Sequence, residues 1–268
     1  MGLVLTNELA IKIEQSEIDC LYSRLSAIKA RKGNPMGVNI EKFGQATAFT
    51  VKNIPGPAFN TVKGLSAGDE DHIDKILHFF KDKDIPARFE LTPGHVSKEL
   101  LSFLSKKGFM QTDFHSTLYS ALESECEEYD ERVHVRELDI SEFDLFGELY
   151  IKGFQLPSFL KSGIAENNEV LYKSENWKFY LASVENELAG IGVLFHKDGI
   201  ATLAAATTVP EYRKKGVQTA LLKVRLNQAI RQNCNLVVGQ ARYGSVSQNN
   251  MERLGLKIAY TKAIWTMG

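Results

Sequence analysis

The second half of the chain, from residue 133 onward, switches repeatedly between the two spacings of apolar residues that distinguish strands from helices. Alternating apolar and polar residues are typical of strands, and apolar residues three and four apart are typical of helices. Short polar turns at 185–187 and 197–199 join three strand-like runs, which predicts an antiparallel meander. The predicted order is a strand at 133–138, a helix at 141–154, three strands at 178–184, 188–196 and 200–209, a helix at 218–234, a strand at 236–240, a short helix at 247–254 and a pair of closing strands within 256–266.

The first half shows a weaker version of the same order. It predicts a helix at 18–31, strands at 46–51 and 59–65, a helix at 70–82, a strand at 87–91, a helix at 97–106 and strands up to 122. The two endings correspond most closely, because FELTPGHVSKELLSFLSKKGF followed by FHSTLY resembles VVGQARYGSVSQNNMERLGL followed by YTKAIW. We interpret this as a diverged internal duplication; an unrelated α+β first half is the alternative.

The segment between the two halves, ESECEEYDER at 123–132, is acidic and has no hydrophobic periodicity. This pattern is typical of a solvated linker. The sequence therefore predicts a first domain at 1–122 and a second at 133–268, each near the common domain size of about 100–150 residues.

Composition narrows the function classes. The 268 residues carry a formal charge of -1, so no global field favours nucleic acid or an anionic membrane. The three cysteines, Cys20, Cys126 and Cys234, have no metal-like spacing and suit reduced thiols, so we expect a cytoplasmic protein without a bound metal. No apolar run approaches the ~20 residues of a membrane span. We expect a monomer or homodimer that contacts neither membrane nor nucleic acid.

The stretch VPEYRKKGVQTALL at 209–222 has the features of an anion site. A strand leads into a basic turn that contains Gly216, and a long helix follows directly. The first amides of a helix lack intrahelical partners and carry partial positive charge, which stabilises an anion. Gly216 lets the backbone approach phosphates closely, and Arg213, Lys214 and Lys215 add charge. A basic surface turn that merely starts a helix is the alternative.

These residues resemble a known family. The pattern R-x-x-G-x-[GA] after V-P-E-Y, between a meander and a later L-G-[FL], is similar to the coenzyme A motif of the GNAT superfamily of N-acetyltransferases. The resemblance covers about 133–268 and implies a GNAT fold, α+β (α/β) with a mixed, mostly antiparallel central sheet flanked by helices, here duplicated in tandem. It implies acetyl-CoA as cosubstrate, with the Val209 amide polarising the acetyl carbonyl. The implied cofactor-binding residues are Thr207, Thr208, Val209, Arg213, Lys214, Lys215, Gly216, Val217, Gln218, Thr219 and Ala220.

The catalytic residues are less clearly marked. Many family members place a tyrosine about four residues before the glycine of L-G-F, where it can protonate the leaving thiolate; here that position is Met251, which has no proton to donate. Ser247 and Asn250 are the candidate catalytic residues that we favour. For a serine at this place the alternative is capping of the following helix, and for Asn250 it is solvated helix surface.

The first half is not expected to bind coenzyme A in the same way. At the corresponding place it has GLSAGDED at 64–71, whose three carboxylates repel a diphosphate. The leading functional hypothesis is therefore an N-acetyltransferase in which a primary amine, of a small molecule, amino acid, peptide or protein, attacks acetyl-CoA directly. A non-catalytic acyl-CoA-binding or sensing protein is the alternative from another class, and an unrelated α+β interaction protein is a third.

Overall fold

The computed structural model describes residues 3–54, 56–126 and 132–268. It divides into two compact units, which we call the C unit (mainly Tyr119–Gly239 and Asn249–Lys257) and the N unit (Val4–Leu118, Gln240–Gln248 and Ile258–Gly268). The expected division into domains 1–122 and 133–268 stays a prediction. In this division the end of the chain, Ile258–Gly268, belongs to the same unit as most of the first half.

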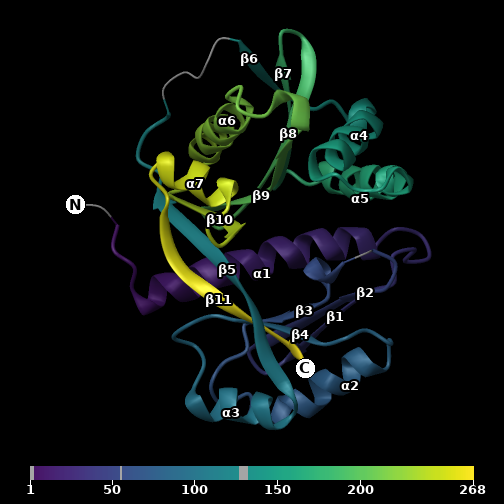
Figure 1. The fold of residues 1–268 in the computed structure, drawn as a ribbon, viewed down its shortest axis with the longest axis vertical. Coiled ribbons are helices and arrows are strands. Elements are labelled where there is room, and N and C mark those ends of the chain that lie inside the picture. The colour runs from purple at the N-terminus through teal and green to yellow at the C-terminus, as the bar shows by residue number, and fades with distance from the viewer. Residues whose placement is uncertain (1–2, 55, 127–131) are drawn as a thin grey trace. The chain divides into compact units, whose positions relative to one another are not determined.

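The C unit is built on the predicted meander (Figure 1). Its strands lie in the order β10-β9-β8-β7-β6, with all neighbours antiparallel except β9 and β10, which run parallel. Both hairpin turns use left-handed residues, at Glu185-Asn186 and at Asp198-Gly199, as tight two-residue turns require. The strands are β6 (Val133–Glu137), β7 (Trp177–Val184), β8 (Glu187–Lys197), β9 (Ile200–Thr208) and β10 (Leu236–Arg242).

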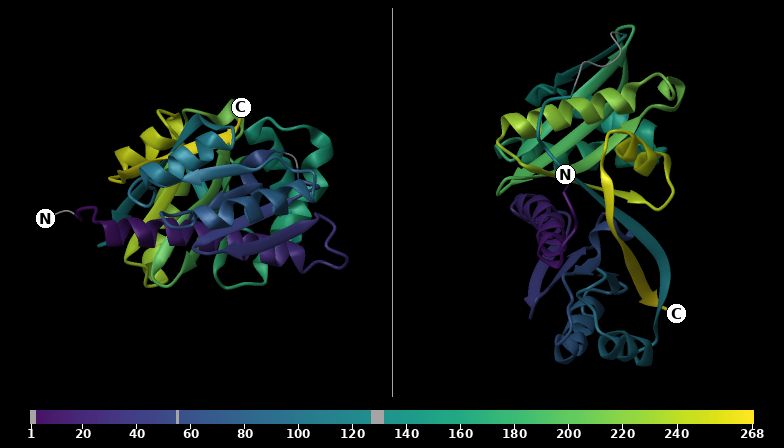
Figure 2. Two further views of the ribbon diagram at one scale, coloured as in Figure 1. Left: turned by 90° about the horizontal axis from the view of Figure 1, so that it is seen from below. Right: turned by 90° about the vertical axis from the view of Figure 1, so that its left-hand side faces the viewer.

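Helices cover both faces of these strands (Figures 1 and 2). The helix α6 (Val217–Arg231) packs where Gly190 and Gly192 of β8 leave room, and α4 (Phe143–Phe154) packs on Thr207 of β9. Side chains alternate between the faces of a strand, and Thr207 pairs with Ile191 rather than with either glycine, so the two helices lie on opposite faces. A further helix, α5 (Lys161–Tyr172), packs against α4 and was not predicted.

The N unit repeats this arrangement. Its strands lie in the order β1-β2-β3-β4-β11-β5. The sequence missed β1 and predicted a closing strand pair where the structure has one strand, β11. The elements are α1 (Asn7–Lys29), β1 (Val38–Phe43), β2 (Ala46–Val51), β3 (Thr61–Lys63), α2 (Ile73–Lys81), β4 (Arg88–Leu91), α3 (Lys98–Lys106), β5 (Phe109–Ala121) and β11 (Lys257–Met267), and α7 (Val246–Arg253) precedes β11.

The two halves of the chain share one topology. In each, three antiparallel strands (β1-β2-β3 and β7-β8-β9) are followed by a helix (α2 and α6) and then by a strand parallel to the third (β4 and β10). A helix and a final long strand complete each half, α3 with β5 and α7 with β11. The repeated order and the repeated sense of pairing confirm the internal duplication.

The core of the N unit holds charged side chains among its apolar residues. Glu17 of α1, Lys63 of β3, Glu90 of β4 and Lys262 of β11 are all less than a tenth exposed. Lys262 pairs with Glu17 and, at 3.0 Å, with Glu90, while Lys63 lies 2.5 Å from Glu90 and 3.5 Å from Glu17. Hydrogen-bonded ion pairs are what make such burial tolerable, and this network ties four elements together.

Candidate functional site

The loop between β9 and α6 is the segment in which the sequence predicts an anion site. Lys214 and Gly216 both have positive φ, +65° and +81°, which turns the chain sharply into the helix. Gly216 is the N-cap of α6 and supplies no side-chain hydrogen bond to it. The first amides of α6, beginning at Val217, therefore have neither a helical partner nor a capping oxygen. They present donors and the positive end of the helix dipole to an anion.

Arg213 shapes this loop from within. Its Nε donates to the Thr208 carbonyl at 3.4 Å and its Nη2 to the Gly153 carbonyl at 3.1 Å. The side chain thus ties the end of β9 to the last turn of α4. Lys215 lies over the Tyr212 ring, with Nζ 5.2 Å from the ring centroid. The residues from 213 to 216 are exposed, so the positive charge of the loop faces solvent.

The strand before the loop has an open edge. Pairing between β9 and β10 joins Ile200–Leu203 to Leu236–Gly239 and ends there, whereas β9 stays paired with β8 up to Thr208. The 204–208 backbone therefore has a strand neighbour on one side only within the C unit. An extended chain segment can add to such an edge by backbone hydrogen bonds.

Solved structures share this arrangement over nearly the whole chain. The sequence matches no protein-family model and no curated protein. A tandem GNAT protein from the clavulanic acid biosynthesis pathway superimposes with a TM-score of 0.65 at 11% identity, covering 99% of this chain and 97% of that one. A GCN5-related N-acetyltransferase from Kribbella flavida gives a TM-score of 0.64 at 12% identity, with 91% and 95% covered.

This chain has the GNAT fold, duplicated in tandem. The same fold is found in a conserved protein of unknown function from Staphylococcus epidermidis, with a TM-score of 0.60 at 12% identity and coverage of 91% and 99%. At such identities the GNAT fold is what the likeness shows, and activity has to be argued from the site.

Within the GNAT fold, the structure corrects the role expected of Val209. Its amide already donates to the Ala189 carbonyl of β8 at 2.9 Å. Backbone groups alternate between the two edges of an antiparallel strand. Val209 and Thr207 therefore direct their backbone groups to β8, and Thr208 directs its own to the open edge. The Val209 amide is not available to an acetyl carbonyl in this arrangement.

The other predicted cofactor residues gather at the end of β9 and the start of α6. Thr207 is buried against α4, where a Cβ on Gly153 would come within 2.4 Å of its side chain. Its neighbour Thr208 donates from Oγ1 to Oε1 of Gln218 at 3.4 Å. This hydrogen bond orients the side chain of Gln218, the third position of the motif. It uses the amide oxygen and not the amide NH₂ group. Val217 and Ala220 are buried in the helix, and Thr219 is exposed.

The two catalytic candidates are not brought into contact with these residues. Ser247 is exposed in the first turn of α7, and the helix is capped instead by Ser245, whose Oγ accepts from the Gln248 amide at 3.3 Å. Asn250 accepts from Arg253 Nη1 at 3.0 Å. Met251, at the position where many family members have tyrosine, is buried with its sulfur close to Gly239.

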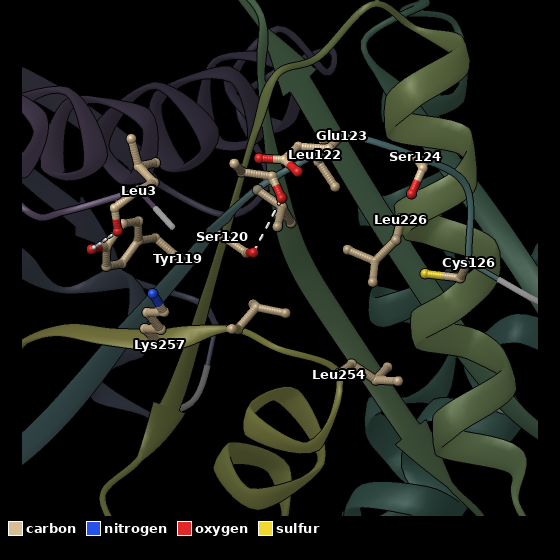
Figure 3. Close-up of a pocket in the computed structure, with 13 residues that line it drawn as sticks. Leu3, Tyr119, Ser120, Leu122, Glu123, Ser124, Cys126, Leu226, Leu254 and Lys257 are labelled. Atoms are coloured by element: carbon tan, nitrogen blue, oxygen red, sulfur yellow. Dashed lines mark hydrogen bonds between the residues drawn. The ribbon is translucent and has the colours of Figure 1, made fainter. Parts of the chain in front are cut away.

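A cavity of about 290 Å³ in the C unit was not signalled by the sequence (Figure 3). Leu226 of α6 and the thiol of Cys126 form part of its wall, with Leu122 and Leu254. Burial raises the pKa of the Cys126 thiol, which keeps it protonated. None of the predicted site residues lines this cavity, so it lies apart from the loop at 209–216.

The corresponding loop of the N unit is filled by its own carboxylates. Asp69 accepts from the amides of Gln45 at 3.3 Å and Ser66 at 3.0 Å, and Glu70 accepts from the amide of Gly68 at 2.9 Å. The carboxylates of Asp69 and Glu70 are therefore bonded to backbone amides of their own unit. Among the described residues, no cluster of three or more metal-ligating side chains is found, and no helix is long and apolar enough to cross a membrane.

Proposed function

We propose that this protein is an acetyl-CoA-dependent N-acetyltransferase whose cosubstrate binds to the C unit along 207–220. The observation that carries the proposal is the N-cap glycine of α6 next to the open edge of β9, within a GNAT fold. The diphosphate fits the free amides at the start of α6, and the pantetheine arm, which carries amide groups, fits the open edge. The adenosine end then lies beside the exposed basic loop at 213–215.

In the proposed reaction, a neutral primary amine attacks the thioester carbonyl. The C–N bond forms to give a tetrahedral intermediate, the C–S bond then breaks, nitrogen gives up one proton to solvent, and the leaving thiolate takes one up, so the products are the N-acetylated amine and free coenzyme A. Negative charge develops on the carbonyl oxygen, so a donor at the open edge accelerates the step. The Thr208 amide is the donor that the strand alternation directs there. Ser247 and Asn250 remain the proposed catalytic residues, Ser247 as a proton donor to the thiolate and Asn250 as a hydrogen-bond donor to it.

The binding step is tested by titrating acetyl-CoA into the protein and into Gly216→Glu. The new carboxylate would sit at the diphosphate position, and we expect no measurable binding by the variant. Gly163→Glu is the matched control, because a side chain at Gly163 of α5 in the same unit meets nothing within 4 Å. Equal acetyl-CoA affinity in wild type and a folded Gly216→Glu variant refutes the site.

A non-catalytic acyl-CoA-binding protein is the second candidate. Met251 favours it, because this buried side chain has no proton to donate at the position where many GNAT proteins have tyrosine. Incubation with radiolabelled acetyl-CoA and a panel of polyamines, amino acids and peptides separates the two functions. Label in an acceptor with wild type but not with Gly216→Glu establishes transfer. Saturable binding without label in any acceptor favours the binding protein.

A further inference from the structure

One charged side chain lies in the core of the C unit without a role in the loop. Arg225, in the middle of α6, is only 1% exposed. In the described part of the chain no carboxylate forms an ion pair with it. Burial lowers the pKa of its guanidinium to about 10, which still leaves the group charged at neutral pH. An unpaired buried cation is costly, so its hydrogen-bond partners indicate what it does.

The partners of Arg225 are backbone carbonyls of three elements. Nε donates to the Leu221 carbonyl one turn earlier in α6 at 2.9 Å. Nη1 donates to the Val193 carbonyl of β8 at 3.3 Å and to the Ala205 carbonyl of β9 at 3.2 Å. The guanidinium therefore bridges the helix to two facing strands. Hydrogen bonds from a charged donor are about twice as strong as those between neutral groups.

These two strand carbonyls mark a break in register. Val193 pairs with Ala205, but the next residue of β8, Leu194, pairs with Leu203, so Ala204 is an extra residue in β9. Such a bulge bends the strand that contains it and increases its twist. The bulge lies where β9 leaves β10, because the pairing between these strands ends at Leu203 with Gly239. The open edge thus begins at the bulged residue, Ala204.

The surroundings of Arg225 leave space for this contact. A Cβ on Gly192 would lie 3.2 Å from the guanidinium Nε and 3.1 Å from Leu221, so a glycine lets α6 approach β8 here. The hydroxyl of Tyr180, opposite Gly192, is buried and has no hydrogen-bond partner. The side chain of Arg225 is buried, and its Nη1 donates to the carbonyls of both strands. These contacts hold the guanidinium in place.

We propose that Arg225 is a positioning residue that holds the β9 bulge and so sets the opening between β9 and β10 for the pantetheine arm and the thioester. This inference rests on the proposed function, because it concerns the same cosubstrate. It adds that one helix acts on two parts of the ligand: its N-terminus receives the diphosphate, and Arg225, two turns later, shapes the strand edge along which the pantetheine arm lies. The two contributions can be separated by ligand fragments.

The test compares two probes on one variant. Arg225→Met keeps the length and apolar stem but removes the donors. Acetyl-CoA reports the loop and the open edge together, whereas ADP carries a diphosphate and no pantetheine arm. We expect Arg225→Met to bind acetyl-CoA about 10–100-fold more weakly, since each hydrogen bond lost at the open edge weakens binding by up to about tenfold, and to bind ADP as wild type does. Arg225→Lys retains a cation and should recover part of the loss.

Arg231→Ala is the matched control, because Arg231 lies on the same helix, is 61% exposed in its side chain and pairs with Glu125 on the surface. Unchanged acetyl-CoA affinity in a folded Arg225→Met overturns the positioning role, and so does an equal loss for both probes, which indicates general damage to the fold. If wild type binds neither probe, the proposed function itself fails, and that outcome is distinct from the other two.

Discussion

The buried charges of the N unit make a quantitative prediction for Lys262→Met. Lys262 is 1% exposed and, like Lys63, contacts both Glu17 and Glu90. Methionine fills a similar volume, so the variant removes the charge with little change in packing. Breaking one side of a buried ion pair typically costs about 3–5 kcal/mol, because the remaining charge is left uncompensated.

The remaining contacts place the expected loss at the low end of this range. Glu17 keeps Lys63 at 3.5 Å and the hydroxyls of Thr117 at 2.6 Å and Tyr260 at 3.3 Å. Glu90 keeps Lys63 and Arg88, each at 2.5 Å. We therefore expect a loss of about 3 kcal/mol in the free energy of unfolding. Because the charges that remain are balanced, the fold should survive.

The assay is urea unfolding of a double-mutant cycle with Glu17→Gln. When both charges of a buried pair are replaced, the change is often close to neutral, so the double variant should be more stable than the sum of the single losses predicts. We expect a coupling of about 2 kcal/mol between the two sites. A loss below about 1 kcal/mol for Lys262→Met, or a coupling near zero, refutes the view that this lysine compensates Glu17.

Acid unfolding gives an independent check with a definite sign. Burial acts to raise the pKa of Glu17 and Glu90, but the ammonium groups of Lys262 and Lys63 outweigh it and hold both pKa values below the usual 4.5. Carboxylates with lowered pKa values stabilise the fold above pH 4.5, and this stability is lost as the pH falls toward their folded values. Lys262→Met has less stability to lose, so we expect the midpoint of its acid unfolding to lie at higher pH than that of the wild type.

Three further predictions concern single sites. If Ser247 protonates the leaving thiolate, Ser247→Ala lowers kcat at least about tenfold with little change in acetyl-CoA affinity, and unchanged turnover removes it from the mechanism. The hydrogen bond that His95 Nδ1 donates to Glu14 Oε2 at 2.6 Å raises the pKa of His95, so this pair stabilises the fold below pH 6.5 and ceases to do so as the pH rises through the folded value; NMR titration should show the pKa fall in Glu14→Gln. Gly153→Ala places a Cβ within 2.4 Å of Thr207, and thermal unfolding should show a loss of about 1–3 kcal/mol.

Local signals made much of the fold predictable. The hairpins of β7, β8 and β9 follow from alternating runs and short turns, and α6 follows from its apolar spacing. The helix α5 was not predicted, because its sequence has little apolar periodicity and two of its buried residues, Asn167 and Asn168, are polar. The single long strand β11 was read as a pair, because its neighbours β4 and β5 come from the distant first half of the chain.

The site was predictable where backbone geometry decides it. Gly216 and the start of α6 follow from the order of residue types alone. The direction of the Val209 amide does not follow from the sequence. The extra residue Ala204 changes by one the number of β9 residues between the hairpin turn and Val209, and so changes the strand edge to which the amide points. The role of Arg225 was not predicted either, because a charged residue on a helix is expected at the surface. Both depend on long-range pairing that one sequence does not display.

The two repeats differ in the loop before the helix, where the N unit has the carboxylate of Asp69 and the C unit has a basic turn. Variants of Asp69 test what this difference does. Asp69 is 5% exposed, and its carboxylate accepts from the amide of Ser66 in the same loop and from the amide of Gln45 in the turn between β1 and β2. Asp69→Ala leaves these amides without that acceptor and should cost about 1–3 kcal/mol. Asp69→Asn retains one acceptor oxygen and should cost less, and Asp71→Ala, at an exposed position in the same loop, serves as the control.

The same variant bears on how many cosubstrate sites one chain holds. If the carboxylates of this loop act only by repulsion, their removal uncovers a second site, and two acetyl-CoA molecules bind per chain of Asp69→Ala. We expect one, because the helix after this loop begins with the acidic turn Glu70–His72, and Glu70 keeps the Gly68 amide occupied. In our proposal the carboxylates of the N unit stay bonded to amides of their own unit, whereas the glycine N-cap leaves the first amides of α6 to the diphosphate. A stoichiometry of two in calorimetric titration would contradict this account.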